Sequence, residues 1–200
     1  MPRLLRIYIG GGLSGMKFQR FAQVLMTGAL LAGSALASDK TNPNLPRTDA
    51  DISKSIQHEL LTYPYYGIFD DLSYKVENGQ VTLYGAVTQP IKKSDIHNIV
   101  AKLPGVEGVT DNVEVLPLSD NDNLLRRQIA ASIYRYPSLS RYGMGTHPSI
   151  HIVVDNGHVT LTGAVDTQAD KDVAGIRASA AGLSFGPIVN NLQVVRPPRT

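Results

Sequence analysis

The sequence of 200 residues contains no cysteine and no tryptophan. The absence of cysteine excludes disulfide bonds, thiolate zinc sites, cysteine nucleophiles and a lipid attached through an N-terminal cysteine. Aromatic residues make up 6% of the chain, and nine of them are tyrosine. With 42% hydrophobic and 18% charged residues, the composition is typical of a globular protein.

Acidic residues are absent from the first 20 positions, which hold Arg3, Arg6, Lys17 and Arg20. The formal net charge of +2 depends on these four cations. From Ser38 onward, 15 Lys and Arg stand against 17 Asp and Glu, a net charge of −2. Bulk charge therefore does not favour nucleic-acid binding, and any anion-binding surface must come from a local cluster.

The apolar stretch Phe21–Gly33 is too short for a membrane span, which needs about 20 apolar residues. Positive charges precede it, and Ala35-Leu36-Ala37 follows as an A-x-A cleavage site. This arrangement predicts a secretory signal peptide over residues 1–37 and a short linker over 38–48. The mature protein is therefore expected to be soluble and periplasmic or extracellular.

The rest of the chain repeats itself. The heptapeptide VTLYGAV at 81–87 recurs as VTLTGAV at 159–165, and an Asn-Gly pair precedes each copy, Asn78-Gly79 and Asn156-Gly157. The matching elements lie 73 to 79 positions apart, because the loops differ in length. The repeat predicts two modules, residues 49–117 and 118–197.

Each module is predicted to fold as α-β-β-α-β. Apolar residues recur every four positions in two stretches of each copy, which predicts two helices, and alternating residues flank each Asn-Gly pair, which predicts a hairpin with a type I′ turn. The fold class is α+β, with a small three-stranded mixed sheet covered by two helices in each module. Asp49 or Asp51 is expected to cap the first helix, and Asp122 or Asn123 its counterpart.

Two further expectations concern the hairpins. Gly85 and Gly163 stand within strands, where glycine permits a bulge or a close approach of a helix. On the second hairpin, His151 and Thr162 are expected to face outward. The last strand of the second module is predicted over Ile188–Val195.

These features resemble the BON domain family of osmotically induced periplasmic proteins and outer-membrane-associated lipoproteins. The carrying residues are the N-G-x-V-T-L-x-G-x-V hairpins at 78–87 and 156–165, and the stretch GVEGVTDNV at 105–113. The resemblance implies a binding module and no enzyme, with phospholipid membranes as the usual proposed target. It supplies no catalytic residue and no cofactor.

The residues give no independent sign of catalysis. No nucleophile elbow, H-E-x-x-H, Walker or dinucleotide motif is present in the mature chain. His147, His151 and His158 fall within twelve residues, which is compatible with a zinc or copper site or with histidines on a solvated face. The hairpin geometry favours the solvated face, and no metal ligand is assigned.

The best candidate for a binding site is a cluster of arginines and tyrosines in the second module. No acid lies between Asn123 and Pro148. Arginines suit anionic headgroups, and tyrosine rings suit the membrane interface. The candidate residues for binding lipid or a partner are Arg126, Arg127, Tyr134, Arg135, Tyr136, Arg141 and Tyr142.

The sequence therefore predicts a periplasmic protein that contacts anionic phospholipid peripherally, in osmotic or envelope stress. The same cluster would equally suit an acidic envelope protein, and a helix face exposed to water is the simplest alternative. A periplasmic chaperone or protein-binding scaffold is the second functional hypothesis. That hypothesis expects exposed apolar surface on the loops at 65–69 and 139–144.

Overall fold

The computed structural model describes residues 5–6, 47–145, 147–182 and 184–195. The predicted signal peptide and linker fall almost entirely outside these ranges. The described chain contains two α/β modules in tandem, each with two helices against a mixed sheet. The predicted α+β fold class is confirmed.

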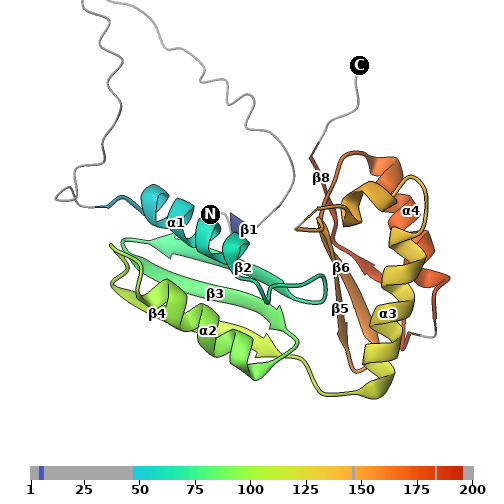
Figure 1. The fold of residues 1–200 in the computed structure, drawn as a ribbon, viewed down its shortest axis with the longest axis horizontal. Coiled ribbons are helices and arrows are strands. Elements are labelled where there is room, and N and C mark those ends of the chain that lie inside the picture. The colour runs from blue at the N-terminus through green and yellow to red at the C-terminus, as the bar shows by residue number, and fades with distance from the viewer. Residues whose placement is uncertain (1–4, 7–46, 146, 183, 196–200) are drawn as a thin grey trace, which may run out of the picture. The chain divides into compact units, whose positions relative to one another are not determined.

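The first module has the predicted order of elements, and Figure 1 shows its two helices beside the sheet. Its elements are α1 (Asp49–Thr62), β2 (Asp71–Glu77), β3 (Gln80–Val87), α2 (Pro90–Ala101) and β4 (Gly108–Val115). Strands β2 and β3 pair antiparallel with Val76 opposite Val81, and β3 and β4 pair parallel. A two-residue strand, β1 (Leu5–Arg6), pairs with β2, so this sheet has four strands where three were expected.

The second module repeats the order, with a short 3₁₀ helix before its hairpin. Its elements are α3 (Asp120–Tyr134), η1 (Ser140–Gly143), β5 (Ile150–Asp155), β6 (His158–Val165), α4 (Gln168–Ser179), β7 (Val189–Asn190) and β8 (Gln193–Val194). The strand predicted over Ile188–Val195 is divided into β7 and β8, which both pair parallel with β6. The division occurs where Leu192 turns into the core, with 1% of its surface exposed.

Each module has its own apolar core, built from one stripe on each helix and the facing side of the sheet. In the first module Ile52, Ile56 and Leu60 of α1 pack with Leu72 and Leu83 of the hairpin. The corresponding residues of the second module are Leu125, Ile129 and Ile133 of α3 with Ile150 and Leu161. These are the periodic apolar residues of the sequence, so the repeated pattern directly determines both cores.

The hairpin turns are bound by a carboxylate of the first helix in each module. Asn78 and Gly79 have φ of 49° and 76°, as a type I′ turn requires, and Asn156 and Gly157 have 48° and 79°. The Asp49 carboxylate accepts hydrogen bonds from the amides of Asn78 and Gly79, at 2.8 and 2.9 Å. Asp122 does the same for the second turn, at 2.9 Å to both amides.

The predicted helix caps are corrected accordingly. The N-cap residues are Thr48 and Ser119, whose hydroxyls accept from the amides of Asp51 and Asp122. Asp51 completes a capping box with Thr48. The sequence-based prediction missed the caps because aspartate, serine and threonine are all favourable at the N-cap. The carboxylates of Asp49 and Asp122 bind the hairpin turns instead.

Replacing Asp122 with asparagine should lower the free energy of unfolding of the second module by about 1–2 kcal/mol, because one of the two turn amides loses its acceptor and the other keeps only a neutral one. Urea unfolding of residues 38–200 measures the change. The matched control is Asp120→Asn, an exposed carboxylate in the same helical turn. Equal losses in the two variants would contradict the assignment.

Gly85 and Gly163 mark a close approach of two backbones. Both have positive φ, 118° and 107°. A Cβ atom at either position would lie 2.0 Å from a carbonyl oxygen of the neighbouring segment, that of Asp71 or Ser149. The crowding that excludes a side chain here comes from the hairpin backbone and not from a helix.

Candidate functional site

The predicted binding residues lie along α3 and the loop that follows it. Leu125, Ile129 and Ile133 face the core, so the opposite side of α3 is exposed. Arg127 and Arg135 lie on this exposed side, and neither has an ion-pair partner among the described residues. Tyr136 follows directly, with 38% of its surface exposed.

Arg177 of α4 joins this group, although the sequence-based prediction did not include it. Its guanidinium lies over the ring of Tyr136, 5.2 Å from the centroid, and its Nε donates to the carbonyl of Ser132. The hydroxyl of Ser132 in turn donates to the carbonyl of Arg177. We call Arg127, Arg135, Tyr136 and Arg177 the α3 cationic face. Only the packing of α4 against α3 places Arg177 here, so no local sequence signal could have found it.

Arg126 lies inside the module, with 3% of its surface exposed. Its guanidinium donates to the side-chain oxygen of Asn123 at 2.7 Å and to the carbonyl of Val154 on β5. Burial lowers the pKa of Arg126, and the nearby Asp122 carboxylate partly opposes this shift. Arg126 therefore acts within the fold and does not belong to the exposed surface.

Tyr134 and Tyr142 also point inward. The Tyr134 hydroxyl donates to the carbonyl of Ile150, and burial raises its pKa. The Tyr142 hydroxyl donates to Asp170 at 2.9 Å and accepts from the amide of Asp166, also at 2.9 Å. Burial raises the pKa of Tyr142 too. Both rings stabilise the module and offer no hydroxyl to a membrane.

Arg141 is exposed, but its charge is already paired. Its guanidinium lies 2.8 Å from Asp170 and 3.6 Å from Asp166, and it donates to the Tyr142 hydroxyl. These contacts tie the loop after α3 to the start of α4. Of the seven predicted residues, the structure thus leaves Arg127, Arg135 and Tyr136 on a free surface.

Two buried residues of the predicted cluster, Arg126 and Tyr134, donate hydrogen bonds to the outer edge of β5. Tyr134 donates to the carbonyl of Ile150, and Arg126 donates to that of Val154. An edge strand presents unpaired backbone groups that would otherwise recruit another strand. The residues at the matching positions of α1, 73 places earlier, are Leu61 and Ser53. Neither residue has a guanidinium or phenol, and β2 is instead flanked by the short strand β1.

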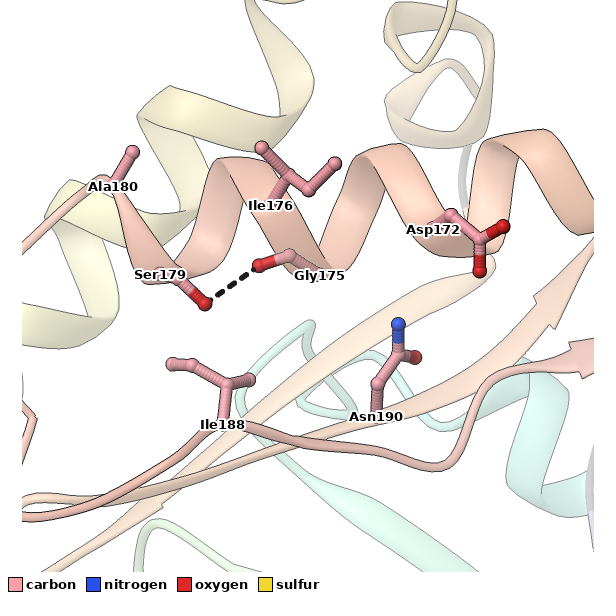
Figure 2. A pocket seen from close by; sticks show the side chains of 7 residues that line it. All are labelled: Asp172, Gly175, Ile176, Ser179, Ala180, Ile188 and Asn190. Atoms are coloured by element: carbon pink, nitrogen blue, oxygen red, sulfur yellow. Dashed lines mark hydrogen bonds between the residues drawn. The ribbon is translucent and has the colours of Figure 1, made fainter.

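Two shallow grooves flank the helices of the second module. Figure 2 shows the first, about 650 Å³ in volume, between α4 and β7. Ile176 stands at its lip with 66% of its surface exposed, whereas Ser179 and Asn190 use their donors on the carbonyls of Gly175 and Lys171. Besides this apolar surface, the groove is lined by the exposed carboxylate of Asp172.

The second groove, about 590 Å³, lies between the start of α3, the hairpin turn and Phe185. Leu124 and Phe185 are exposed there, by 49% and 76%. Leu124 lies on the same exposed side of α3 as Gln128, one turn later, and Arg135, two turns beyond Gln128. Apolar side chains therefore lie beside the α3 cationic face.

The loops expected to offer apolar surface to a protein client are largely packed. Leu139 and Tyr142 are buried, and Phe69 packs against the core of the second module. Within these two loops, Tyr65 and Met144 remain exposed, by 67% and 72%.

The histidines do not form a cluster in the described residues. No group of three or more His, Asp or Glu side chains in the described ranges is arranged to hold a metal ion. His158 is exposed at the turn, whereas His151 has 4% of its surface exposed. Thr162, opposite His151 on β6, has 1% exposed. The expectation that both residues face outward into water is wrong: both are buried, and the segment before β2 contacts the ring of His151.

Models of known protein families were compared with the chain to identify its family. The model for the BON domain matches it twice, at residues 48–117 and 121–196. The chain belongs to the BON domain family. The recognition of a tandem BON protein from its hairpins is thereby confirmed.

BON domains are generally associated with phospholipid binding and with envelope or osmotic stress proteins, and the family is generally non-enzymatic. Within the described part of this BON protein, no helix is long and apolar enough to cross a bilayer.

Solved structures with detectable similarity include two of CdsD, a structural protein of the type III secretion system of Chlamydia trachomatis. They are 19% and 18% identical over 72% and 74% of this chain, each with a TM-score of 0.29. The matches span 61% and 66% of the CdsD chains, the second of which is the C-terminal domain. No curated protein matches the chain.

Proposed function

We propose that this BON protein acts in the periplasm as a non-enzymatic envelope protein that binds anionic phospholipid surfaces through its second module. The α3 cationic face makes the contact, with the apolar side chains of Leu124 and Phe185 beside it. The general association of BON domains with phospholipid supports the ligand class. A role in osmotic or envelope stress belongs to the same proposal.

The observation that carries the proposal is the unpaired charge on the exposed side of α3. Arg127 and Arg135 project from a stretch, residues 124–147, that contains no acid. A cation near an anionic membrane contributes about 1 kcal/mol, and a tyrosine such as Tyr136 is favoured at headgroup depth. The matching side of α1 carries Lys54 but also Glu59, so the first module offers a weaker surface.

The overall charge determines how this binding behaves. Residues 38–200 carry a net charge of −2, so only an oriented approach brings the arginines to an anionic surface. At physiological ionic strength such exposed charges are screened beyond about 8 Å. Binding is therefore expected to be weak and sensitive to salt.

Co-sedimentation of residues 38–200 with liposomes tests the proposal. We expect binding to vesicles that contain phosphatidylglycerol and not to pure phosphatidylcholine, with loss of binding in high salt. Arg127→Ala/Arg135→Ala should weaken binding about 10- to 30-fold, since two cations at about 1 kcal/mol each are removed.

The matched control removes two exposed cations of the first module, Lys54→Ala/Lys102→Ala. This variant has the same net charge as Arg127→Ala/Arg135→Ala, but it should bind liposomes as the wild type does. Absence of binding to every vesicle, or equal losses in the two double variants, would overturn the proposal. Binding to an acidic envelope protein would then be the better explanation of the α3 cationic face.

A further inference from the structure

The outer edge of β5 is covered between its two side-chain donors by a segment of the first module. The Ile152 amide donates to the carbonyl of Ile68 at 2.7 Å, and Phe69 packs against the core of the second module. Ile68 and Phe69 belong to the segment Tyr66–Phe69, which precedes β2. This segment therefore supplies the β5 edge with the backbone acceptor that the second module itself does not provide.

His151 lies at the centre of this contact. Its Nδ1 is 3.2 Å from the carbonyl oxygen of Gly67, and its ring lies against that of Tyr66, with centroids 5.2 Å apart and an interplanar angle of 33°. Because a carbonyl oxygen accepts only, Nδ1 carries the proton and the neutral ring has its lone pair on Nε2. Nε2 is buried and has no partner in the described ranges, and the same holds for the hydroxyl of Thr162.

We propose that the contact between Tyr66–Phe69 and β5 is a pH-controlled latch, which neutral His151 keeps closed and protonated His151 releases. A second proton on this ring must go to Nε2, which is buried and makes no hydrogen bond within the described structure. A buried charge with an unmet donor costs several kcal/mol unless it is paired. Opening of the latch exposes the ring to water and removes that cost.

The groups around His151 determine the direction of the effect. The carboxylates of Asp71 and Asp70 lie on the first module near the ring and favour its charged form, as do the backbone acceptors of Asp70 and Gly67. Asp70 is already paired with Lys92, at 2.7 Å. From β6 the facing residue is Thr162, which carries no charge. Burial outweighs these contributions and lowers the pKa of His151 from 6.5.

A lowered pKa means that the open form binds the proton more readily than the closed form. The latch is therefore fully stable above pH 6.5 and loses stability as the pH falls below that value. At pH 5 a histidine of pKa 6.5 in the open form is about 30 times more often protonated than neutral. If the closed form binds no proton, the ratio of open to closed protein therefore rises by at most about 30-fold between pH 8 and pH 5. The inference does not depend on membrane binding.

Energy transfer between two dyes tests the latch. The absence of cysteine permits specific labelling at Lys102→Cys and Ser179→Cys, exposed positions on the first and second modules. We expect the transfer efficiency to change between pH 8 and pH 5 with a midpoint below 6.5. The imidazole carbon resonance of His151, followed by NMR, should titrate over the same range.

Two variants make the test specific. His151→Gln keeps a donor for the Gly67 carbonyl but cannot titrate, so its transfer efficiency should be constant over this pH range. His158→Gln removes an exposed histidine of the same hairpin and should leave the transition intact. Circular dichroism at each pH verifies that both modules remain folded. A flat response in the wild type, or an unchanged transition in His151→Gln, would overturn the proposal.

Discussion

Replacing Arg126 with alanine is expected to lower the free energy of unfolding of the second module by about 3 kcal/mol. The variant leaves the carbonyl of Val154 buried without its donor, which costs about 1–3 kcal/mol. It also removes buried methylene groups worth about 0.8 kcal/mol each. The melting temperature of a module of this size should fall by roughly 10–20 °C.

Arg127→Ala is the neighbouring control for this experiment. Arg127 is exposed, so its loss should change stability by no more than about 0.5 kcal/mol. The two adjacent arginines therefore predict opposite results: Arg126→Ala changes stability and not liposome binding by the folded protein, and Arg127→Ala the reverse. Similar stability of the two variants would show that Arg126 is not held as described.

Replacing Asp70 with alanine should have the largest effect in the first module, a loss of about 3–5 kcal/mol. Asp70 is completely buried. One carboxylate oxygen accepts from the amide and hydroxyl of Thr88, at 2.8 and 2.9 Å. The other accepts from the Gly67 amide at 2.9 Å and from Lys92 Nζ at 2.7 Å. Removal of the carboxylate leaves the buried Lys92 ammonium without its anion, with only the Thr88 hydroxyl as acceptor, and leaves two partly buried amides without theirs.

Thermal unfolding followed by circular dichroism measures the loss, and amide resonances of the first module show whether it alone has unfolded. Glu114→Ala, an exposed carboxylate on β4, should be nearly neutral. The pair Asp70→Ala/Lys92→Met should recover part of the loss, because the unpaired ammonium is gone. A melting point within a few degrees of the wild type for Asp70→Ala alone would contradict the role assigned to this carboxylate.

The helices, hairpins and cores could be predicted from sequence because each rests on a local pattern. The four-residue spacing of Ile52, Ile56 and Leu60 identifies one buried stripe, and an Asn-Gly pair between alternating residues identifies a turn. Helix ends were less certain, since Thr48 and Asp49 are both good capping residues. Their division between capping the helix and binding the turn depends on where the hairpin lies in space.

The site could be predicted only in part, because position along a helix does not reveal what covers each side chain. Arg126 and Arg127 are adjacent and chemically identical. Arg126 is nevertheless buried and donates to a carbonyl of β5, whereas Arg127 is exposed to water. His151 alternates with the core residues of β5, so the strand pattern predicts that its side chain is exposed. The segment that covers it lies more than 80 positions earlier, beyond any local pattern.

The paired donors of α3 also bear on how a duplicated chain assembles correctly. Because the two modules have nearly identical hairpins, the first helix of one module could pack on the sheet of the other during folding. Such misassembly is typical of repeat proteins. If α1 occupied the place of α3, Ser53 and Leu61 would stand where Arg126 and Tyr134 donate, and the carbonyls of Val154 and Ile150 would lose both partners. Crosswise assembly is thereby penalised, and each helix is matched to its own hairpin.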